Sequence, residues 1–179
     1  MIKYILLALL PLMFLCVTDQ SVKNTSYTTQ SGEKVLRLEL VLPIDKKEAW
    51  ELFATDGQLQ KWIAPLAHVE LKTGGYILTN YDKAKTLSDS SSIKLDIINY
   101  IEQELLTLKV NLNDHFPKSL QAEDDNLQEI IQFIPDGPGR TRIISSMIGW
   151  GQGDQWAKAY TFFEKGNLWT YEELRKLFK

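Results

Sequence analysis

Cysteine and histidine are scarce in this chain of 179 residues, which has one Cys and two His. The cysteine is Cys16, so a domain that begins after it has no thiol for a disulfide, a thiolate metal site or a nucleophile. His68 and His115 have no Cys partner with which to build a zinc site. His115 stands beside Asp114, but no Ser or Cys nucleophile is spaced to use the pair. We therefore expect no metal, no cofactor and no catalytic set.

An excess of positive charge is also absent. The 20 Lys and Arg are balanced by 23 Asp and Glu, for a formal net charge of -3. Surfaces that bind nucleic acid carry clustered basic side chains, so we expect no nucleic-acid partner. Hydrophobic residues make up 44% of the chain, which is ordinary for a globular protein and excludes a disordered or fibrous one. Nothing in the sequence indicates an oligomeric state.

A membrane-spanning run is missing from the N-terminus. The uncharged segment from Tyr4 to Val17 is shorter than the ~20 apolar residues that a bilayer span needs. Lys3 precedes it, and a positive charge before a short apolar segment is typical of a secretory signal peptide. We predict a signal peptide over residues 1–21 and export to the periplasm or the extracellular space. Two alternatives stay open, a lipoprotein leader modified at Cys16 and an uncleaved leader, and either would attach the protein to a membrane.

Alternating apolar residues follow a polar segment, residues 22–33, which we interpret as a linker. Four leucines between Val35 and Pro43 occupy every second position, as on a half-buried strand. Gly74-Gly75 predicts a tight hairpin, because glycine tolerates positive φ. Further strands are expected near residues 67–72, 76–81, 93–97, 106–112, 127–134 and 140–148. Segments 82–92 and 113–126 are polar or acidic and are expected to be loops.

Helix signals occur at both ends of this strand-rich region. Asp45 and Glu48 resemble a capping box before a short helix, and Asp56 is placed to cap a second one that ends near Trp62. Residues 154–178 carry an apolar stripe at helical spacing, with Asp154 as the expected N-cap and Gly166-Asn167 as a weak point. Antiparallel strands with helices segregated from them predict an α+β domain over residues 34–179.

Several motifs resemble a known family at this point. They are Pro43, Trp50, Phe53, Thr55, Leu59 and Trp62, then Gly74-Gly75-Tyr76, and finally Gly149-Trp150-Gly151 with Trp156, Tyr160 and Phe163-Glu164-Lys165-Gly166. Together they are similar to the SRPBCC superfamily of START-like proteins, of the type that activates a heat-shock-protein ATPase. The resemblance runs from about Val35 to Phe178. It implies a helix-grip fold, in which a curved antiparallel sheet of about six to seven strands wraps a long C-terminal helix, with two short helices after the first strand.

The sequence departs from the family in one strand. Members often carry Pro or His after an aromatic residue there, whereas Tyr100 is followed by Ile101-Glu102-Gln103. Ligand identity is therefore not transferred from the family.

The resemblance also implies a cavity between the sheet and the helix. Aromatic and Met side chains make an adaptable apolar lining. The candidate pocket residues are Trp150, Trp156, Tyr160, Phe163, Tyr100, Met147 and Trp62. A filled core is the competing interpretation, because core and pocket residues have the same composition. Either Arg142 or Ser145 points inward with Tyr100 and Tyr160 to orient a ligand, depending on the strand register.

These features favour an exported binding protein for a small hydrophobic or amphipathic, lipid-like molecule. Two alternatives stay open. The first is a protein-interaction module, as in the co-chaperone branch of the family. The second is an enzyme that uses the same pocket, which an inward-facing carboxylate or histidine with a shifted pKa would favour.

Overall fold

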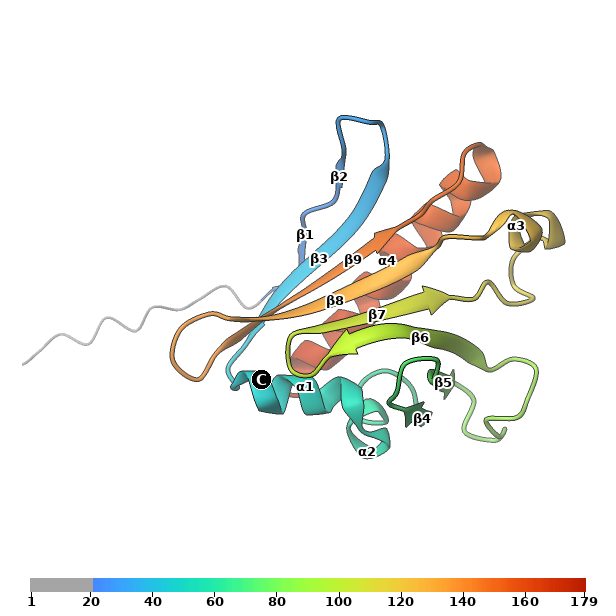
Figure 1. The fold of residues 1–179 in the computed structure, drawn as a ribbon. Helices are drawn as coiled ribbons and strands as arrows, with labels where there is room; N and C mark the ends of the chain where they lie inside the picture. The colour runs from blue at the N-terminus through green and yellow to red at the C-terminus, as the bar shows by residue number, and fades with distance from the viewer. Residues whose placement is uncertain (1–20) are drawn as a thin grey trace, which may run out of the picture.

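The computed structural model describes residues 21–179, so the predicted leader falls almost wholly outside the described part of the chain. An antiparallel sheet packs on one long C-terminal helix, and two short helices lie at one end of the sheet (Figure 1). This is the α+β, helix-grip arrangement that the sequence predicts. Between residues 21 and 179, no helix is both long and apolar enough to cross a membrane.

Within the described residues the sheet has nine strands, and its main path runs β1-β3-β9-β8-β7-β6-β5-β4 with β2 beside β3. The strands expected from the sequence are β3 (Lys34–Leu42), β4 (Leu66–Glu70), β5 (Tyr76–Asn80), β6 (Ile93–Ile101), β7 (Leu105–Val110), β8 (Gln128–Pro135) and β9 (Thr141–Ile148). The other two, β1 (Lys23–Asn24) and β2 (Tyr27–Thr28), belong to the segment interpreted as a linker and pair with β3. Their residues are polar and show no alternation with apolar ones, so the sequence does not predict these strands. They form because they pair with the free edge of β3.

Alternation in β3 has the predicted result. Leu36, Leu38, Leu40 and Leu42 are all buried, because every second side chain of a strand points to the same face. The hairpin from β4 to β5 turns at Gly74, whose φ is +77°. A Cβ on Gly75 would lie 1.9 Å from the carbonyl oxygen of Glu70, so the turn requires glycine there as well.

The two short helices are α1 (Lys46–Ala54) and α2 (Asp56–Leu59). Asp45 caps α1, since its Oδ1 accepts from the backbone N–H of Glu48 at 2.9 Å. The prediction that Asp56 caps the second helix is wrong, because Thr55 occupies the cap position. The Asp56 carboxylate instead bonds to the backbone N–H of Val69 at 2.7 Å and to His68 Nδ1 at 2.8 Å, which ties α2 to β4.

The long helix α4 (Asp154–Lys176) lies behind the sheet in Figure 1 and passes Gly166-Asn167 without interruption. Its N-cap is Gly153, with φ +94°, and Asp154 is its first residue, which corrects the predicted cap. At that position the negative charge of the Asp154 carboxylate still interacts favourably with the positive end of the helix dipole.

A further helix, α3 (Lys118–Glu123), interrupts the segment expected to be a loop. Tertiary contacts with Trp156 hold this helix in place. Leu120 is buried beside Trp156, and Trp156 Nε1 donates to Glu123 Oε2 at 3.1 Å. So short an element depends on such packing rather than on its own helix propensity.

Two clusters of buried residues make up the core. One joins α1, α2 and the end of α4 to the sheet and includes Phe53, Leu108 and Tyr171. The other surrounds Trp156 at the start of α4 and includes Met147. Residues from both clusters line one cavity, so the cavity lies where the two halves of the core separate.

Candidate functional site, an apolar cavity with one carboxyl group

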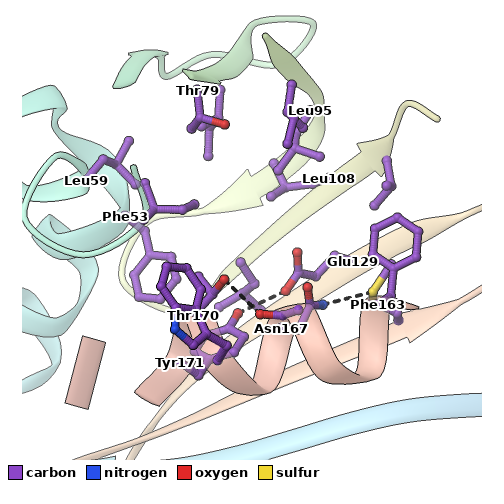
Figure 2. Close-up of a pocket in the computed structure, with 18 of the residues that line it drawn as sticks. Phe53, Leu59, Thr79, Leu95, Leu108, Glu129, Phe163, Asn167, Thr170 and Tyr171 are labelled. Atoms are coloured by element: carbon purple, nitrogen blue, oxygen red, sulfur yellow. Dashed lines mark hydrogen bonds between the residues drawn. The ribbon is translucent and has the colours of Figure 1, made fainter. Parts of the chain in front are cut away.

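A cavity of about 350 Å³ lies between the sheet and α4 (Figure 2). Its volume falls within the usual range of small-molecule pockets, roughly 300–1,000 Å³. Most of its wall is apolar, from Phe53, Leu59, Trp62, Ile63, Ile77, Ile93, Leu95, Leu108, Val110, Ile131, Met147, Phe162, Phe163 and Trp169. The more polar remainder consists of Thr79, Tyr81, Glu129, Gly166, Asn167, Thr170 and Tyr171.

Glycine in α4 helps to keep this space open. Gly166 lies on the wall, and a Cβ built there would meet nothing within 4 Å. Two of its helix neighbours on the wall already bond to protein atoms. Asn167 Nδ2 donates to Met147 Sδ at 3.0 Å, and Thr170 Oγ1 donates to the carbonyl oxygen of Gly166 at 3.0 Å.

Exposed aromatic side chains belong to the same wall. Tyr81, Phe162 and Trp169 are 48%, 57% and 53% exposed, although large apolar side chains usually avoid water. The rings of Tyr81 and Trp169 lie 6.5 Å apart, between the end of β5 and α4. The cavity therefore opens to solvent beside an aromatic rim, which we define as Tyr81, Phe162 and Trp169.

Among residues 21–179, Glu129 is the one carboxyl group on the wall. It lies on β8 in phase with the buried residues Leu127, Ile131 and Phe133, so strand alternation turns it toward the interior. Its Oε1 accepts two hydrogen bonds, one from Ser145 Oγ at 2.6 Å. The other comes from the Tyr171 hydroxyl at 2.9 Å (Figure 2).

Burial governs the ionisation of Glu129 and of its hydrogen-bond partner Tyr171. Desolvation raises the pKa of Glu129 above its usual range, although the hydrogen bonds from Ser145 and Tyr171 oppose this effect. Burial and the neighbouring Glu129 together hold the pKa of Tyr171 well above its usual range. Within the described chain, no Lys, Arg or His lines the cavity, so no cation is available there to stabilise a carboxylate.

Three of the seven predicted pocket residues lie on this wall, namely Trp62, Met147 and Phe163. The Trp62 ring lies 6.1 Å from that of Tyr171, and its Nε1 donates to the carbonyl oxygen of Leu52 at 2.9 Å. The sheet and the helix thus both contribute, as a cavity between them requires.

The other four predicted residues lie elsewhere. Trp150, Trp156 and Tyr160 line a separate, more polar hollow near Gly151 and Lys34. Tyr100 packs against Trp50, with ring centroids 6.0 Å apart. Trp150, Trp156 and Tyr160 therefore belong to the second core cluster and to that hollow, and they do not reach the cavity.

The structure resolves the register that the sequence left open. Ser145 is buried and reaches Glu129, whereas Arg142 bonds to Asp136 Oδ1 at 2.7 Å and Glu39 Oε2 at 3.4 Å outside the cavity. Glu129 itself was missed from sequence. Its phase with Leu127 and Ile131 was the available signal, but a charged residue in a strand is usually assigned to the solvent face.

The two histidines do not take part in the cavity wall. His68 pairs with Asp56, and its side chain is 44% exposed. Asp114, next to His115, pairs with Lys118 instead. Over residues 21–179, no group of three His, Cys, Asp or Glu residues is placed to hold a metal ion.

Comparison with known proteins places the fold. No family model and no curated protein matches the sequence. A solved protein from Mesorhizobium loti is 14% identical with a TM-score of 0.61, over 80% of this chain and 95% of that one. One from Nitrosomonas europaea is 18% identical with a TM-score of 0.58, over 80% and 92%. An HSP90 activator from Plasmodium falciparum is 12% identical with a TM-score of 0.54, over 80% and 94%.

At these identities the likeness concerns the fold alone. It agrees with the resemblance to START-like proteins of the heat-shock-activator type, since such an activator is among the structural neighbours. The chain therefore has the helix-grip fold that the resemblance implied.

Proposed function

We propose that this protein binds a small hydrophobic or amphipathic molecule in the cavity between the sheet and α4. The observation that carries the proposal is the cavity itself, about 350 Å³ of mostly apolar space between the buried residues of the sheet and α4. Native interiors contain few voids larger than a water molecule, because an empty apolar space forfeits dispersion contacts. A ligand would restore those contacts.

The aromatic rim supports the same proposal. Exposed apolar side chains beside the opening of a pocket are typical of a binding site rather than of inert surface. Tyr81 and Trp169 combine an apolar ring with a polar tip, which suits a site where an apolar ligand leaves water. An amphipathic molecule could enter beside these two rings and place its chain among Leu95, Leu108 and Ile131.

Two variants on one strand test the proposal. Leu95→Trp adds bulk to the cavity wall, whereas Ile98→Trp adds it on the exposed side of β6. Native mass spectrometry of the purified protein and fluorescence titration with the neutral apolar dye N-phenyl-1-naphthylamine would measure occupancy. We expect the wild type and Ile98→Trp to bind, and Leu95→Trp to bind at least about tenfold more weakly, because a cavity that is filled cannot hold the dye. Equal binding by all three would contradict the proposal.

One observation favours a second candidate, an enzyme. Glu129 is an inward-facing, desolvated carboxyl group, which is the kind of residue that acts as a general acid. A molecule that co-purifies with the protein would then change mass on incubation with the wild type and stay intact with Glu129→Gln. Identical, unchanged masses in both incubations would favour binding alone.

We further propose that the protein is exported and works outside the cytoplasm. The charged start and short apolar run of residues 1–21 carry this proposal, as does the absence of cysteine from the rest of the chain. The intact mass of protein recovered from each cell fraction would test it. An unprocessed mass in the cytosol would argue against export, and a mass increase by a diacylglyceryl group at Cys16 would indicate the lipoprotein alternative.

A further inference from the structure

The two oxygens of Glu129 have different surroundings. Oε1 accepts both of the hydrogen bonds that the carboxyl group receives, from Ser145 and Tyr171. Oε2 receives none from the described residues. It is not sealed inside the protein, because Arg140 Nε is the only fully buried, unpartnered side-chain nitrogen or oxygen between residues 21 and 179. Since Glu129 belongs to the cavity wall, its accessible oxygen faces the cavity.

This asymmetry fits a neutral carboxyl group. In a carboxylic acid the carbonyl oxygen accepts hydrogen bonds and the hydroxyl oxygen needs an acceptor. Two donors on Oε1 satisfy both lone pairs of a carbonyl oxygen, which leaves Oε2 as the hydroxyl. A carboxylate would instead leave a charged oxygen with no donor from the described residues beside apolar groups such as Leu108, and that arrangement is costly once an apolar ligand excludes water from the cavity.

We propose that Glu129 is the polar anchor of the cavity and donates its Oε2 hydrogen to an acceptor oxygen on an uncharged, otherwise apolar ligand. The ligand class is a ketone, ester or alcohol with a hydrocarbon body. This inference rests on the proposed binding function and adds which ligands the cavity selects. A carboxyl group that an apolar site keeps neutral is a known hydrogen-bond donor of this kind.

The rest of the wall supports this selection. Anionic head groups such as fatty-acid carboxylates would find no cation among the wall residues that the structure describes and would meet Glu129 instead. Thr170 Oγ1 already donates its one hydrogen to a protein atom, so it does not replace Glu129 as a donor, whereas Asn167 Nδ2 uses only one of its two hydrogens, on Met147 Sδ. Thr79 contributes a hydroxyl on β5, far from Glu129 across the cavity in Figure 2, and it provides a matched control.

Four proteins separate the alternatives, namely wild type, Glu129→Gln, Glu129→Met and Thr79→Val. The Gln side chain keeps an acceptor for Ser145 and Tyr171 and presents an N–H in place of the Oε2 hydrogen. The Met side chain has a similar length and no strong donor. The Thr79→Val variant removes a hydroxyl from the same cavity without changing its shape.

The measurement is displacement of N-phenyl-1-naphthylamine at pH 7 by decan-2-one, decane, decylamine and decanoate, after thermal unfolding has shown that each variant is folded. We expect the wild type and Thr79→Val to prefer decan-2-one to decane and to decanoate. Glu129→Gln should keep that preference. Glu129→Met should lose about five- to tenfold of its affinity for decan-2-one, the effect of one hydrogen bond, while binding the dye and decane as before.

Other outcomes would overturn the inference. A wild type that prefers decylamine, with Glu129→Gln losing that preference, would mean that a carboxylate recognises cations. Unchanged ketone affinity in Glu129→Met would mean that Glu129 is no anchor. If Glu129→Met does not fold, loss of the ketone preference in Glu129→Gln would contradict the inference on its own. Failure of the wild type to bind the dye or any probe would reject the binding function itself, which is a different result.

Discussion

Both proposed roles of the cavity, ligand binding and catalysis, involve Glu129. The ionisation of Glu129 also links the stability of the fold to pH. Burial raises the pKa of Glu129 above its usual value of 4.5 in the folded chain, so the folded state holds this proton more tightly than the unfolded state does. Stability from the neutral acid is fully present below pH 4.5 and is lost as the pH rises through the folded pKa. The titratable neighbour on α4, Tyr171, stays neutral throughout because its own pKa is raised.

Glu129→Gln should remove this pH dependence, since an amide does not titrate in that range. Urea unfolding of the wild type and the variant from pH 4 to pH 8 would measure it. We expect the free energy of unfolding of the wild type to fall relative to that of Glu129→Gln as the pH rises above 4.5. Parallel curves across the whole range would show that the pKa of Glu129 is the same in the folded and unfolded chains.

For single residues, prediction from sequence succeeded where the inward or outward position given by the periodicity agreed with the polarity of the side chain. Met147 and Trp62 are apolar residues in the right phase, and both lie on the cavity wall. Glu129 has the inward phase but the composition of a surface residue, so type and phase conflict. Only the hydroxyl groups of Ser145 and Tyr171, which come from β9 and α4, resolve the conflict, and their convergence on one oxygen is a tertiary fact.

Gly151, just before α4, and Gly166, inside it, have opposite structural requirements. A Cβ on Gly151, just before α4, would lie 2.2 Å from the Trp156 indole nitrogen, whereas a Cβ on Gly166 inside α4 would meet nothing within 4 Å. Gly151→Ala should therefore destabilise the protein by about 1–3 kcal/mol through overpacking. Gly166→Ala should stabilise it by roughly 0.5–1 kcal/mol, because alanine loses less conformational entropy in a helix.

Urea unfolding of both variants against the wild type would check the two signs. Gly57→Ala in α2 serves as a further control, because a Cβ there also meets open space. A loss of stability in Gly166→Ala would show that α4 is not a regular helix at that residue. An unchanged Gly151→Ala would show that the Trp156 ring moves aside at little cost.

Elements with a strong local pattern were predictable, and those held by partners were not. Alternating leucines and the Gly74-Gly75 turn identify strands without any tertiary knowledge. The short elements β1, β2 and α3 have no such pattern, because the edge of β3 and the packing around Trp156 create them. The helix caps were predictable only in part. Asp45 was identified, whereas Thr55 and Gly153 take the caps expected of Asp56 and Asp154.

For the whole molecule, the unresolved question was whether the sheet and helix enclose space or a filled core. Composition cannot decide this, because Leu108 on the cavity wall and Leu106 on the same strand are the same residue type. The difference arises from how the two core clusters separate along α4. Such spacing depends on sheet curvature and on Gly166, and no local stretch of sequence encodes it.

A cavity between two core clusters links ligand binding to global stability. A ligand that binds only the folded state raises the free energy of unfolding by about 2.7 kcal/mol at a concentration 100 times its Kd. Decan-2-one should therefore raise the melting temperature of the wild type and of Ile98→Trp, and raise that of Leu95→Trp by clearly less, as differential scanning fluorimetry would show. Hydrogen exchange should slow in the same experiment along α4 near Gly166 and along β7 near Leu108, since the ligand would join the two clusters there. Stabilisation of Leu95→Trp to the same extent as the wild type would place the ligand outside this cavity.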